Sequence, residues 1–257
     1  MYGAIIGDLA GSIYEYNQTK EIKPIQIKNI IEDNSFYSDD TILTIAVLDA
    51  ILNDNKYEKY LKEYILSYSN KLPNHKPYFK NMFSPGSILW AKDLKEGNSR
   101  GNGAMMRISA VGWLSENEKE VIKHSKLATI PSHNTEEAIS AATLTALIIY
   151  YFKKGFTKKE LLKKLKLDIK YEPFTKFNTT CNETIGNCLY ALYISNSFEE
   201  AIRNTILMGG DTDTNACIVG SMAEALYGIN DELKRQALEK IPNDFQKILK
   251  KSDKFYR

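Results

Sequence analysis

Helical periodicity runs through almost the whole chain of 257 residues and leaves little room for a sheet. The segment 39–54 (DDTILTIAVLDAILND) is apolar on nearly every face, which is typical of a buried helix. The segment 135–155 carries acids in its first turn and lysines in its last, and it ends at Gly155, as a helix with both ends marked does. The best strand candidate, residues 23–30, stands alone, and a lone strand cannot make a sheet. The sequence therefore predicts an all-α fold.

Further helices are predicted from the same pattern and from residues suited to helix starts. Ser84 is suited to cap a helix whose first turn holds Pro85, and either Ser132 or Thr135 is suited to cap the next long helix. The longest irregular stretch is 70–85. The remaining predicted helices are amphipathic or apolar and cover residues 57–69, 116–127, 158–165, 182–195, 197–210, 215–228 and 231–239.

Three glycines near the N-terminus, Gly3, Gly7 and Gly11, are spaced four residues apart. On a helix this spacing gives one flat stripe, where a second helix can approach closely. Glycine costs about 1 kcal/mol against alanine inside a helix, so close packing is expected to offset that cost. Asp8 would then lie within a tightly packed region, and Glu15 is predicted to end this helix.

The composition fits a globular protein and argues against several other classes. Hydrophobic residues make up 43% of the chain and charged residues 26%, and the formal net charge of +2 gives no support for a nucleic-acid or membrane partner. The chain has only three cysteines, a low and odd number that does not make a disulfide framework. A reducing compartment is therefore expected, most simply the cytoplasm. The N-terminal segment has acids and no basic region, so neither a signal peptide nor a membrane span is predicted. Without a low-complexity linker, residues 1–257 are expected to form a single domain.

Two acid-rich stretches each precede an apolar helix. The first is YSDDT, residues 37–41, in which Ser38 is suited to cap the helix while Asp39 and Asp40 lie at its N-terminal end. The simpler interpretation is a helix cap with acids favoured by the helix dipole. The helix that follows is too apolar for the surface, however. Its start is therefore expected near the core, where paired carboxylates need a cation.

The second stretch is GGDTDTNA, residues 209–216, and it again precedes an apolar helix. Asp211 and Asp213 supply carboxylates, and Thr214 or Asn215 is suited to cap the helix. Two known acid motifs do not fit. An EF-hand loop requires glycine at its sixth position and glutamate at its twelfth, where this chain has alanine and methionine. A DxDx[TV] phosphatase nucleophile follows a strand, whereas the surroundings here are helical and the fifth residue is asparagine.

Together the two stretches place two pairs of acids and two hydroxyls at the starts of buried helices, and Glu15 is able to join them. These groups are all hard oxygens, which suit Mg²⁺ or Mn²⁺ better than Zn²⁺ or Cu²⁺. One Mg²⁺ usually keeps several waters, so this number of acids is better used by two ions about 3.5–4 Å apart. The candidate metal ligands are Ser38, Asp39, Asp40, Asp211, Asp213, Thr214 and Glu15.

A third stretch, EGNSRGNGAMMRISAVGW at residues 96–113, is rich in glycine. Its backbone can come close to a ligand, and its amides can hold phosphate. A plain connector carries equal weight, since neither GxGxxG nor the P-loop lysine pattern is present. A fourth stretch, PSHNTEE, contains His133. A single histidine is more often structural than catalytic, and His75 and His124 receive only the structural interpretation.

These stretches, in this order, resemble the ADP-ribosylglycohydrolase family. The likeness runs from GAIIGDLAGSIYE through YSDDT, GNGAMMR and SHNTEEA to GGDTDTNACIVGSMAEALYG, and so covers almost the whole chain. The family includes the dinitrogenase-reductase-activating glycohydrolase and the hydrolases of ADP-ribosylarginine and ADP-ribosylserine. The resemblance implies a compact, single-domain orthogonal helix bundle that holds a binuclear Mg²⁺ or Mn²⁺ centre.

The resemblance also implies roles for individual residues. The two metal motifs of the family, [ST]DD and DxD[ST], fall on the acids and hydroxyls named above, and the glutamate of the ADP-ribosylserine branch matches Glu15. Arg100 stands where that branch has a stacking aromatic residue, so it is expected to meet a phosphate or to stack by its guanidinium plane. The positions expected to bind the ligand are Asp8, Arg100, Gly101, Asn102, Gly103, Met105, Arg107, His133, Gly209 and Gly210.

The function that this resemblance implies is hydrolysis of the glycosidic bond at C1 of the distal ribose of an ADP-ribosyl group. The metals would orient the sugar while a carboxylate handles proton transfers and water attacks. Glu15 is the first candidate for this acid/base role in serine-type chemistry, and Asp39 or Asp40 in arginine-type chemistry. The expected substrate partner is an ADP-ribosylated protein, and the chain is expected to be a monomer.

Two alternatives keep the same fold. The substrate is a small ADP-ribose derivative in the first, such as O-acetyl-ADP-ribose or ADP-ribose 1″-phosphate. In the second, the chain is a non-catalytic protein that binds ADP-ribose or serves a structural purpose. The acids retained at both motifs argue against the second alternative.

Overall fold

The fold is organised around two helices, α1 (Tyr2–Gln18) and α12 (Thr212–Tyr227), which pack backbone against backbone. The computed structural model describes residues 1–71 and 81–255. As the residue number rises along α1, the contacted residue number falls along α12, so the two helices are antiparallel. A Cβ atom added to the glycine stripe of α1 would lie 1.9 to 2.2 Å from a carbonyl oxygen of α12, in the pairs Gly3 with Gly220, Gly7 with Ala216 and Gly11 with Thr212.

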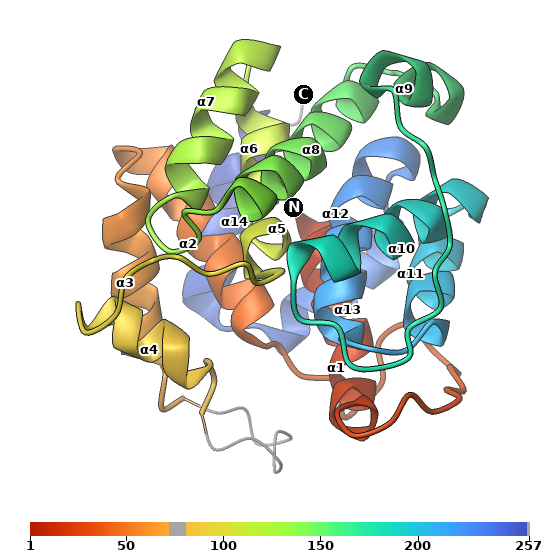
Figure 1. The fold of residues 1–257 in the computed structure, drawn as a ribbon, viewed down its shortest axis with the longest axis horizontal. Coiled ribbons are helices and arrows are strands. Elements are labelled where there is room, and N and C mark those ends of the chain that lie inside the picture. The colour runs from red at the N-terminus through yellow and green to blue at the C-terminus, as the bar shows by residue number, and fades with distance from the viewer. Residues whose placement is uncertain (72–80, 256–257) are drawn as a thin grey trace.

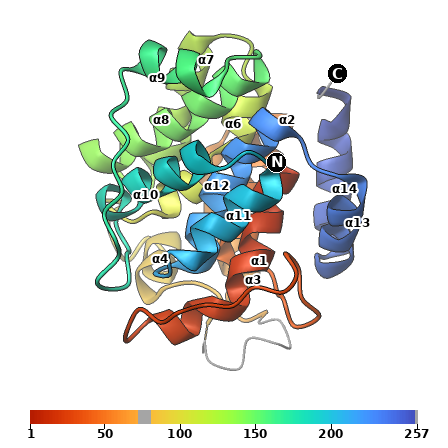
Figure 2. The same cartoon turned by 90° about the vertical axis from the view of Figure 1, so that its right-hand side faces the viewer.

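The other helices surround this pair (Figures 1 and 2). They are α2 (Asp39–Asn53), α3 (Tyr57–Tyr68), α4 (Pro85–Ala91), α5 (Gly103–Met106), α6 (Ser109–Leu114), α7 (Glu118–Thr129), α8 (Glu136–Lys153), α9 (Lys158–Leu165), α10 (Cys181–Ile194), α11 (Phe198–Leu207), α13 (Asp231–Lys240) and α14 (Asn243–Ser252), followed by the short 3-10 helix η1 (Asp253–Phe255). The part of the chain that the structure describes contains no strand, so the prediction of an all-α fold is confirmed.

The hydrophobic core centres on α12, in which every residue from Thr212 to Glu224 is buried. It packs against α1, α8, α10 and α11, while α13 and α14 form the side of the molecule opposite α9 (Figure 2). The predicted buried helix, α2, is also enclosed over most of its length and packs against α3, α6 and α14. No helix among the described residues is both long and apolar enough to cross a bilayer.

Several predicted helix starts are confirmed by their capping hydrogen bonds. The side-chain oxygen of Ser38 accepts from the backbone N–H of Asp40 at the start of α2. Ser84 caps α4, which has a proline in its first turn, and Thr135, rather than Ser132, caps α8. A side-chain acceptor at these positions satisfies an N–H group that the helix itself leaves unpaired.

The start of α12 differs from the prediction, which placed Thr214 or Asn215 at the cap. The helix begins earlier, because Gly209 and Gly210 turn the chain with φ angles of 73° and 74° that other residues rarely adopt. Asp211 then occupies the cap position, and the predicted caps lie inside the helix. The first helix also runs further than predicted, to Gln18 rather than ending at Glu15.

Two other regions contain helices that were not predicted. The glycine-rich stretch 96–113 holds α5 and α6, which are too short to show periodicity in the sequence. The amphipathic helix α14 was not singled out, although its buried residues follow helical spacing. Part of the predicted irregular stretch 70–85, together with His75, lies outside the described residues.

Replacing Gly7 by alanine tests the role of close helix packing. The added Cβ would lie 1.9 Å from the Ala216 oxygen, so α1 must move away from α12, and we expect a loss of about 3 kcal/mol in the free energy of unfolding. Gly186→Ala in α10 is the matched control, because the only atom that its Cβ would meet within 4 Å lies 3.9 Å away. Alanine should stabilise that helix by up to about 1 kcal/mol. Chemical denaturation of both variants measures the difference, and equal stabilities would contradict this account of the packing.

Candidate active site

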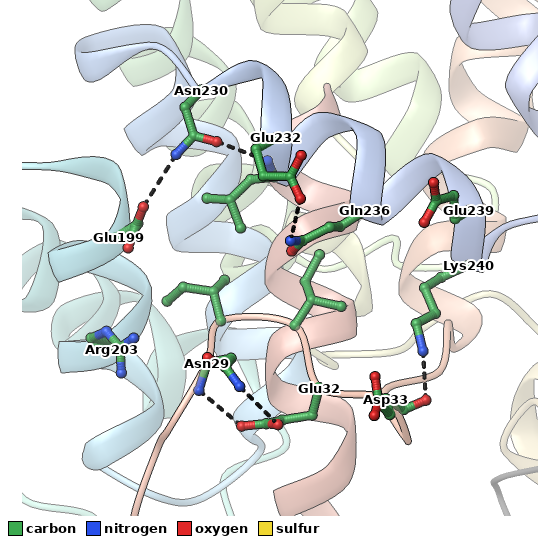
Figure 3. A pocket seen from close by; sticks show the side chains of 13 residues that line it. Asn29, Glu32, Asp33, Glu199, Arg203, Asn230, Glu232, Gln236, Glu239 and Lys240 are labelled. Atoms are coloured by element: carbon green, nitrogen blue, oxygen red, sulfur yellow. Dashed lines mark hydrogen bonds between the residues drawn. The ribbon is translucent and has the colours of Figure 1, made fainter.

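Two hollows on the described part of the molecule differ in chemistry. One, of about 590 Å³, lies between residues 29–33 and helices α11 and α13 (Figure 3). It contains none of the predicted site residues, and its polar side chains are largely engaged with one another, as Asn29 is with Glu32 and Asn230 with Glu199. The other hollow is a cleft of about 740 Å³ that the predicted acids line. Most of the predicted site residues therefore gather in this cleft.

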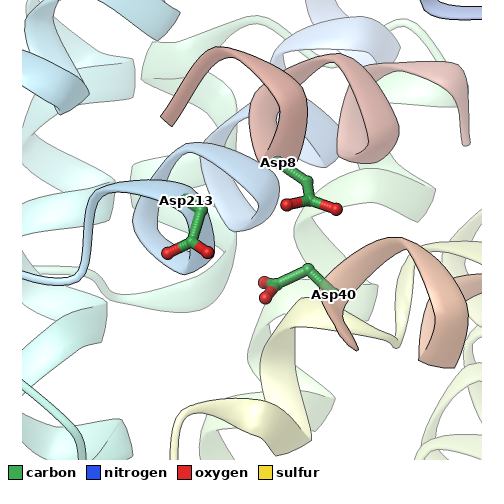
Figure 4. Close-up of side chains that lie close together, drawn as sticks. All are labelled: Asp8, Asp40 and Asp213. Carbon is green, nitrogen blue, oxygen red and sulfur yellow. The ribbon is translucent and has the colours of Figure 1, made fainter. Parts of the chain in front are cut away.

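Three helices bring three buried acids together at the base of the cleft. Asp8 comes from α1, Asp40 from α2 and Asp213 from α12, and Figure 4 shows their carboxylates converging. One oxygen from each lies within 4.8 Å of the others. A second group with the same spacing consists of Glu15, Asp211 and Asp213. The two groups adjoin each other because they share Asp213.

The start of α2 is held in place by the acid from α1. One oxygen of Asp8, Oδ2, accepts hydrogen bonds from the Ser38 N–H at 2.9 Å, the Thr41 N–H at 3.0 Å and the Thr41 hydroxyl at 2.5 Å. Asp40 is oriented in turn, since its Oδ2 accepts from the hydroxyls of Ser38 and Thr214. Both hydroxyls predicted as metal ligands therefore lie against a carboxylate of the same group.

The remaining oxygens of two of these acids suit a hard cation. Within the described residues, Oδ1 of Asp8 and Oδ1 of Asp40 are buried and have no hydrogen-bond partner. Burying such an oxygen without a donor is costly, and a divalent cation coordinated by carboxylates would remove that cost. An all-oxygen set of this kind fits Mg²⁺ or Mn²⁺.

Burial and mutual repulsion disfavour the charged forms of these acids. Burial raises the pKa of Asp8 to about 7, and the nearby carboxylate of Asp213 adds to the effect. Burial likewise raises the pKa of Asp40 and the pKa of Asp211 well above the ordinary value, again with a contribution from Asp213. A bound cation would reverse this preference, because it favours the ionised carboxylates.

The second metal motif is held by two asparagines from outside α12. The backbone N–H of Asp211 donates to Oδ1 of Asn178, and the side-chain amide of Asn102 donates to Oδ2 of Asp211 at 2.7 Å. Asn102 was predicted to bind the ligand, and in this structure its amide contacts an acid of the candidate metal centre. Asn178 was not singled out, because a lone asparagine in a loop carries no recognisable signal.

The glycine-rich loop is tied to two other segments and forms a wall of the cleft. Isolated β-bridges join Asn98 to His133 and Gly101 to Thr180. A Cβ atom at Gly97 would lie 1.9 Å from the carbonyl oxygen of Pro131, so only glycine allows this approach. The loop is therefore a fixed surface rather than a plain connector.

The predicted site residues divide into those that line the cleft and those that do not. Cleft-lining residues are Glu15, Asp39, Asp40, Asp211, Asp213, Thr214, Gly101, Asn102, Gly103, Arg107 and His133. The others are not part of this lining. Asp8 and Ser38 are fully buried beneath it, Met105 lies in the core, and Gly209 and Gly210 shape the turn before α12. The guanidinium of Arg100 pairs with Glu137 at 2.6 Å, so its predicted contact with a phosphate stays a prediction.

The structure adds cleft residues that the sequence did not indicate. An apolar wall contains Phe83 and Trp90, and a polar part of the lining includes Ser132 and Thr179. A lone aromatic residue in a short helical segment gives the same pattern as a core residue, so no signal in the sequence separates the two. His124 bonds to Tyr57, away from the cleft, in agreement with its structural interpretation.

The pKa shifts predict how the stability of the metal-free protein depends on pH. Asp8 ionises with a pKa of 3.8 when unfolded and about 7 when folded, so the folded state binds the proton more tightly. The contribution of Asp8 to the free energy of unfolding is fully present below pH 3.8 and is lost as the pH rises through about 7. It amounts to on the order of 4 kcal/mol at about 1.4 kcal/mol per pKa unit. Denaturation in EDTA should therefore show stability falling over this range, and Mn²⁺ should restore stability most at the alkaline end.

Two variants separate this effect from general titration. Asp8→Asn keeps an acceptor oxygen for the start of α2 and removes the charge, so the fall in stability should become shallower. Asp33→Asn changes an exposed residue and should leave the slope as it is. An identical pH profile for Asp8→Asn and the unaltered protein would contradict the assignment.

The comparisons with known proteins identify the family of this chain. The sequence model of the ADP-ribosylglycohydrolase family matches residues 1–257. Human ADP-ribosylhydrolase ARH3 is 21% identical over 311 residues, which cover 89% of this chain and 84% of the relative. An ADP-ribosyl glycohydrolase of Acanthamoeba polyphaga mimivirus is 23% identical over 302 residues, 94% and 92% of the two chains. ADP-ribosylarginine hydrolase Tri1 of Pseudomonas putida is 21% identical over 276 residues, 90% and 70% of the two chains.

A solved structure is similar over nearly the whole fold. It is described as an ADP-ribosylglycohydrolase-related protein complex and superposes with a TM-score of 0.64 at 18% identity, covering 99% of this chain and 92% of the other. A structural likeness at this low identity shows the fold alone, whereas the match to the family model over the whole chain shows the family. The chain therefore belongs to the ADP-ribosylglycohydrolase family, a family of hydrolases.

Proposed function

We propose that this protein is a hydrolase, dependent on two Mg²⁺ or Mn²⁺ ions, that removes ADP-ribose from a modified protein side chain. The bond broken is the glycosidic bond at C1 of the distal ribose. The observation that carries the proposal is the pair of adjoining carboxylate groups, which share Asp213 at the base of a cleft. Its volume of about 740 Å³ lies within the usual range of about 300–1,000 Å³ for small-molecule sites.

The residues that would hold the metals fall into the two groups. Asp40, Asp213 and Asp8 converge in one group, and Glu15, Asp211 and Asp213 in the other. Bound there, the ions would supply charge stabilisation and a fixed orientation for the sugar hydroxyls. Asp39, Ser38 and Thr214 complete the predicted ligand set, and of these Asp39 and Thr214 line the cleft.

A carboxylate of the cleft is proposed to move the protons of the reaction. Glu15 and Asp39 are half-buried and line the cleft, so each can reach a substrate atom as well as solvent. Asp40 is buried, and two hydroxyls hold its Oδ2. This arrangement suits Glu15 for protonating the leaving group or activating a water. Asp39 and Asp40 remain the candidates in arginine-type chemistry.

The rest of the cleft is proposed to hold the ADP portion. The loop at Gly101–Gly103 offers a backbone surface for the diphosphate. The aromatic residues Phe83 and Trp90 in the same lining offer a flat surface for a base. The leaving group would face the side of the cleft that Glu15 occupies.

A substrate panel separates this proposal from its alternatives. The protein, with and without Mg²⁺ or Mn²⁺, is incubated with ADP-ribosylarginine and ADP-ribosylserine peptides, O-acetyl-ADP-ribose and ADP-ribose 1″-phosphate. Mass spectrometry then measures the free ADP-ribose. Turnover of a peptide supports the proposal, and turnover of the small compounds alone supports the first alternative. Binding without turnover of any compound would show a non-catalytic protein.

The double variant Asp211→Asn with Asp213→Asn tests the metal centre directly. Asparagine preserves the shape of both side chains and removes two negative charges, so a folded helical protein should remain. Release of ADP-ribose should fall at least about 100-fold, because metal affinity and charge stabilisation are both lost. Calorimetry with Mn²⁺ measures the loss of binding, and circular dichroism monitors the fold.

An exposed aspartate on α13 provides the control for this experiment. Asp231→Asn removes the charge of an exposed residue that is not part of the cleft lining, and it should keep full activity. Full turnover by the double variant in the presence of EDTA would refute the metal mechanism.

A further inference from the structure

A buried arginine in the cleft lining has no carboxylate partner among the described residues. The side chain of Arg107 is 1% exposed, and it forms no ion pair with any described residue. One guanidinium nitrogen, Nη2, donates to the Ala128 carbonyl at 3.1 Å and to the Ser132 hydroxyl at 2.7 Å. Burial lowers the pKa of Arg107 to about 10, so it stays positively charged at neutral pH. An uncompensated buried cation is costly, which calls for a role.

The hydroxyl that accepts from this arginine also contacts a histidine of the cleft. Oγ of Ser132 lies 2.7 Å from Nδ1 of His133. A hydroxyl has one hydrogen to donate, and a guanidinium cannot accept it. Among the described residues, Nδ1 of His133 is the acceptor in reach of that hydrogen. Nδ1 therefore accepts, and the single proton of the neutral ring lies on Nε2.

We propose that Arg107, acting through Ser132, holds His133 as the Nε2–H tautomer, so that the ring donates a hydrogen bond to an oxygen of the bound ligand. Arg107 and Ser132 are then positioning residues. The hydrogen bond to the ligand, which is the ligand half of this inference, rests on the proposed function. The tautomer of His133, which is the tautomer half, is a property of the free protein and does not depend on it.

The position of the ring agrees with this role. A Cβ atom at Gly101 or Gly103 would lie 3.4 or 3.6 Å from Nε2 of His133, so the ring edge faces the glycine loop. Burial, together with the charge of Arg107, lowers the pKa of His133 well below its ordinary value and keeps the ring neutral. A neutral Nε2–H suits an acceptor oxygen such as that of a phosphate or a hydroxyl. The same tautomer cannot serve as a general base from Nε2.

The backbone of this segment is fixed without the serine side chain. The His133 N–H donates to the Thr129 carbonyl at 2.9 Å, and a β-bridge joins His133 to Asn98. Removing the hydroxyl of Ser132 therefore frees the orientation and tautomer of the ring and leaves the loop in place. Arg107 is less suitable for substitution, since its whole side chain is buried.

Nuclear magnetic resonance of ring-labelled histidine tests the tautomer in the free protein. The chain has three histidines, and His133→Gln identifies the signals of His133. The unaltered protein should show a protonated Nε2 and an unprotonated Nδ1 at neutral pH. Ser132→Ala should shift the population toward Nδ1–H, and Ser132→Thr, which keeps the hydroxyl, should restore the original tautomer. Ser125→Ala, which removes another buried serine hydroxyl on α7, is the matched control and should leave His133 unchanged.

Calorimetry with ADP-ribose tests the contribution to binding. Loss of one oriented donor to a charged oxygen should weaken binding about tenfold in Ser132→Ala, with recovery in Ser132→Thr. A protonated or Nδ1–H ring in the unaltered protein, or a spectrum unaffected by Ser132→Ala, would overturn the inference. If ADP-ribose fails to bind the unaltered protein, the proposed function and the ligand half fall, while the spectrum still decides the tautomer.

Discussion

The candidate site depends on how closely α1 approaches α12. A Cβ atom at Gly11 would lie 2.4 Å from the Cα of Asp213, so the glycine stripe touches the acid that both carboxylate groups share. Gly7 makes the neighbouring contact, one residue before Asp8. A larger side chain at either glycine would move Asp8 away from Asp213. The packing that builds the core therefore also sets the spacing of the acids.

This close packing brings carboxylates together, so that repulsion between their charges destabilises the folded state. Two like charges 4 Å apart repel by about 4 kcal/mol at an effective dielectric constant near 20. Asp8 shows how this repulsion is accommodated, since one of its oxygens fixes the start of α2 with three hydrogen bonds while the other is buried without a hydrogen-bond partner. A divalent cation would relieve the repulsion without changing those hydrogen bonds. Metal binding and stability would thus be linked through the same side chain.

Features that lie within one segment of the chain can be predicted from the sequence. Apolar helices, the glycine stripe and the acids at two helix starts are each visible within one segment, and the structure bears out the all-α fold and brings the acids together. Contacts between distant segments could not be predicted in the same way. The grouping of Asp8 with Asp40 and Asp213 depends on the register of three helices, and the pairing of Arg100 with Glu137 depends on where the loop lies. No single segment encodes either relation.

The two walls of the cleft are held in place by different parts of the fold. The acids proposed for the chemistry lie on core helices, and the wall proposed to recognise the substrate is a loop. The acids project from α1, α2 and α12, whose positions are fixed by core packing. The other wall is a loop fixed by β-bridges to residues outside those helices, and loops of this kind can change with little effect on a core. A hydrogen bond from Asn102 to Asp211 joins the two walls. Any shift of the loop when a ligand binds would reach Asp211 through this amide, which would couple recognition to the carboxylates that we propose act on the bond.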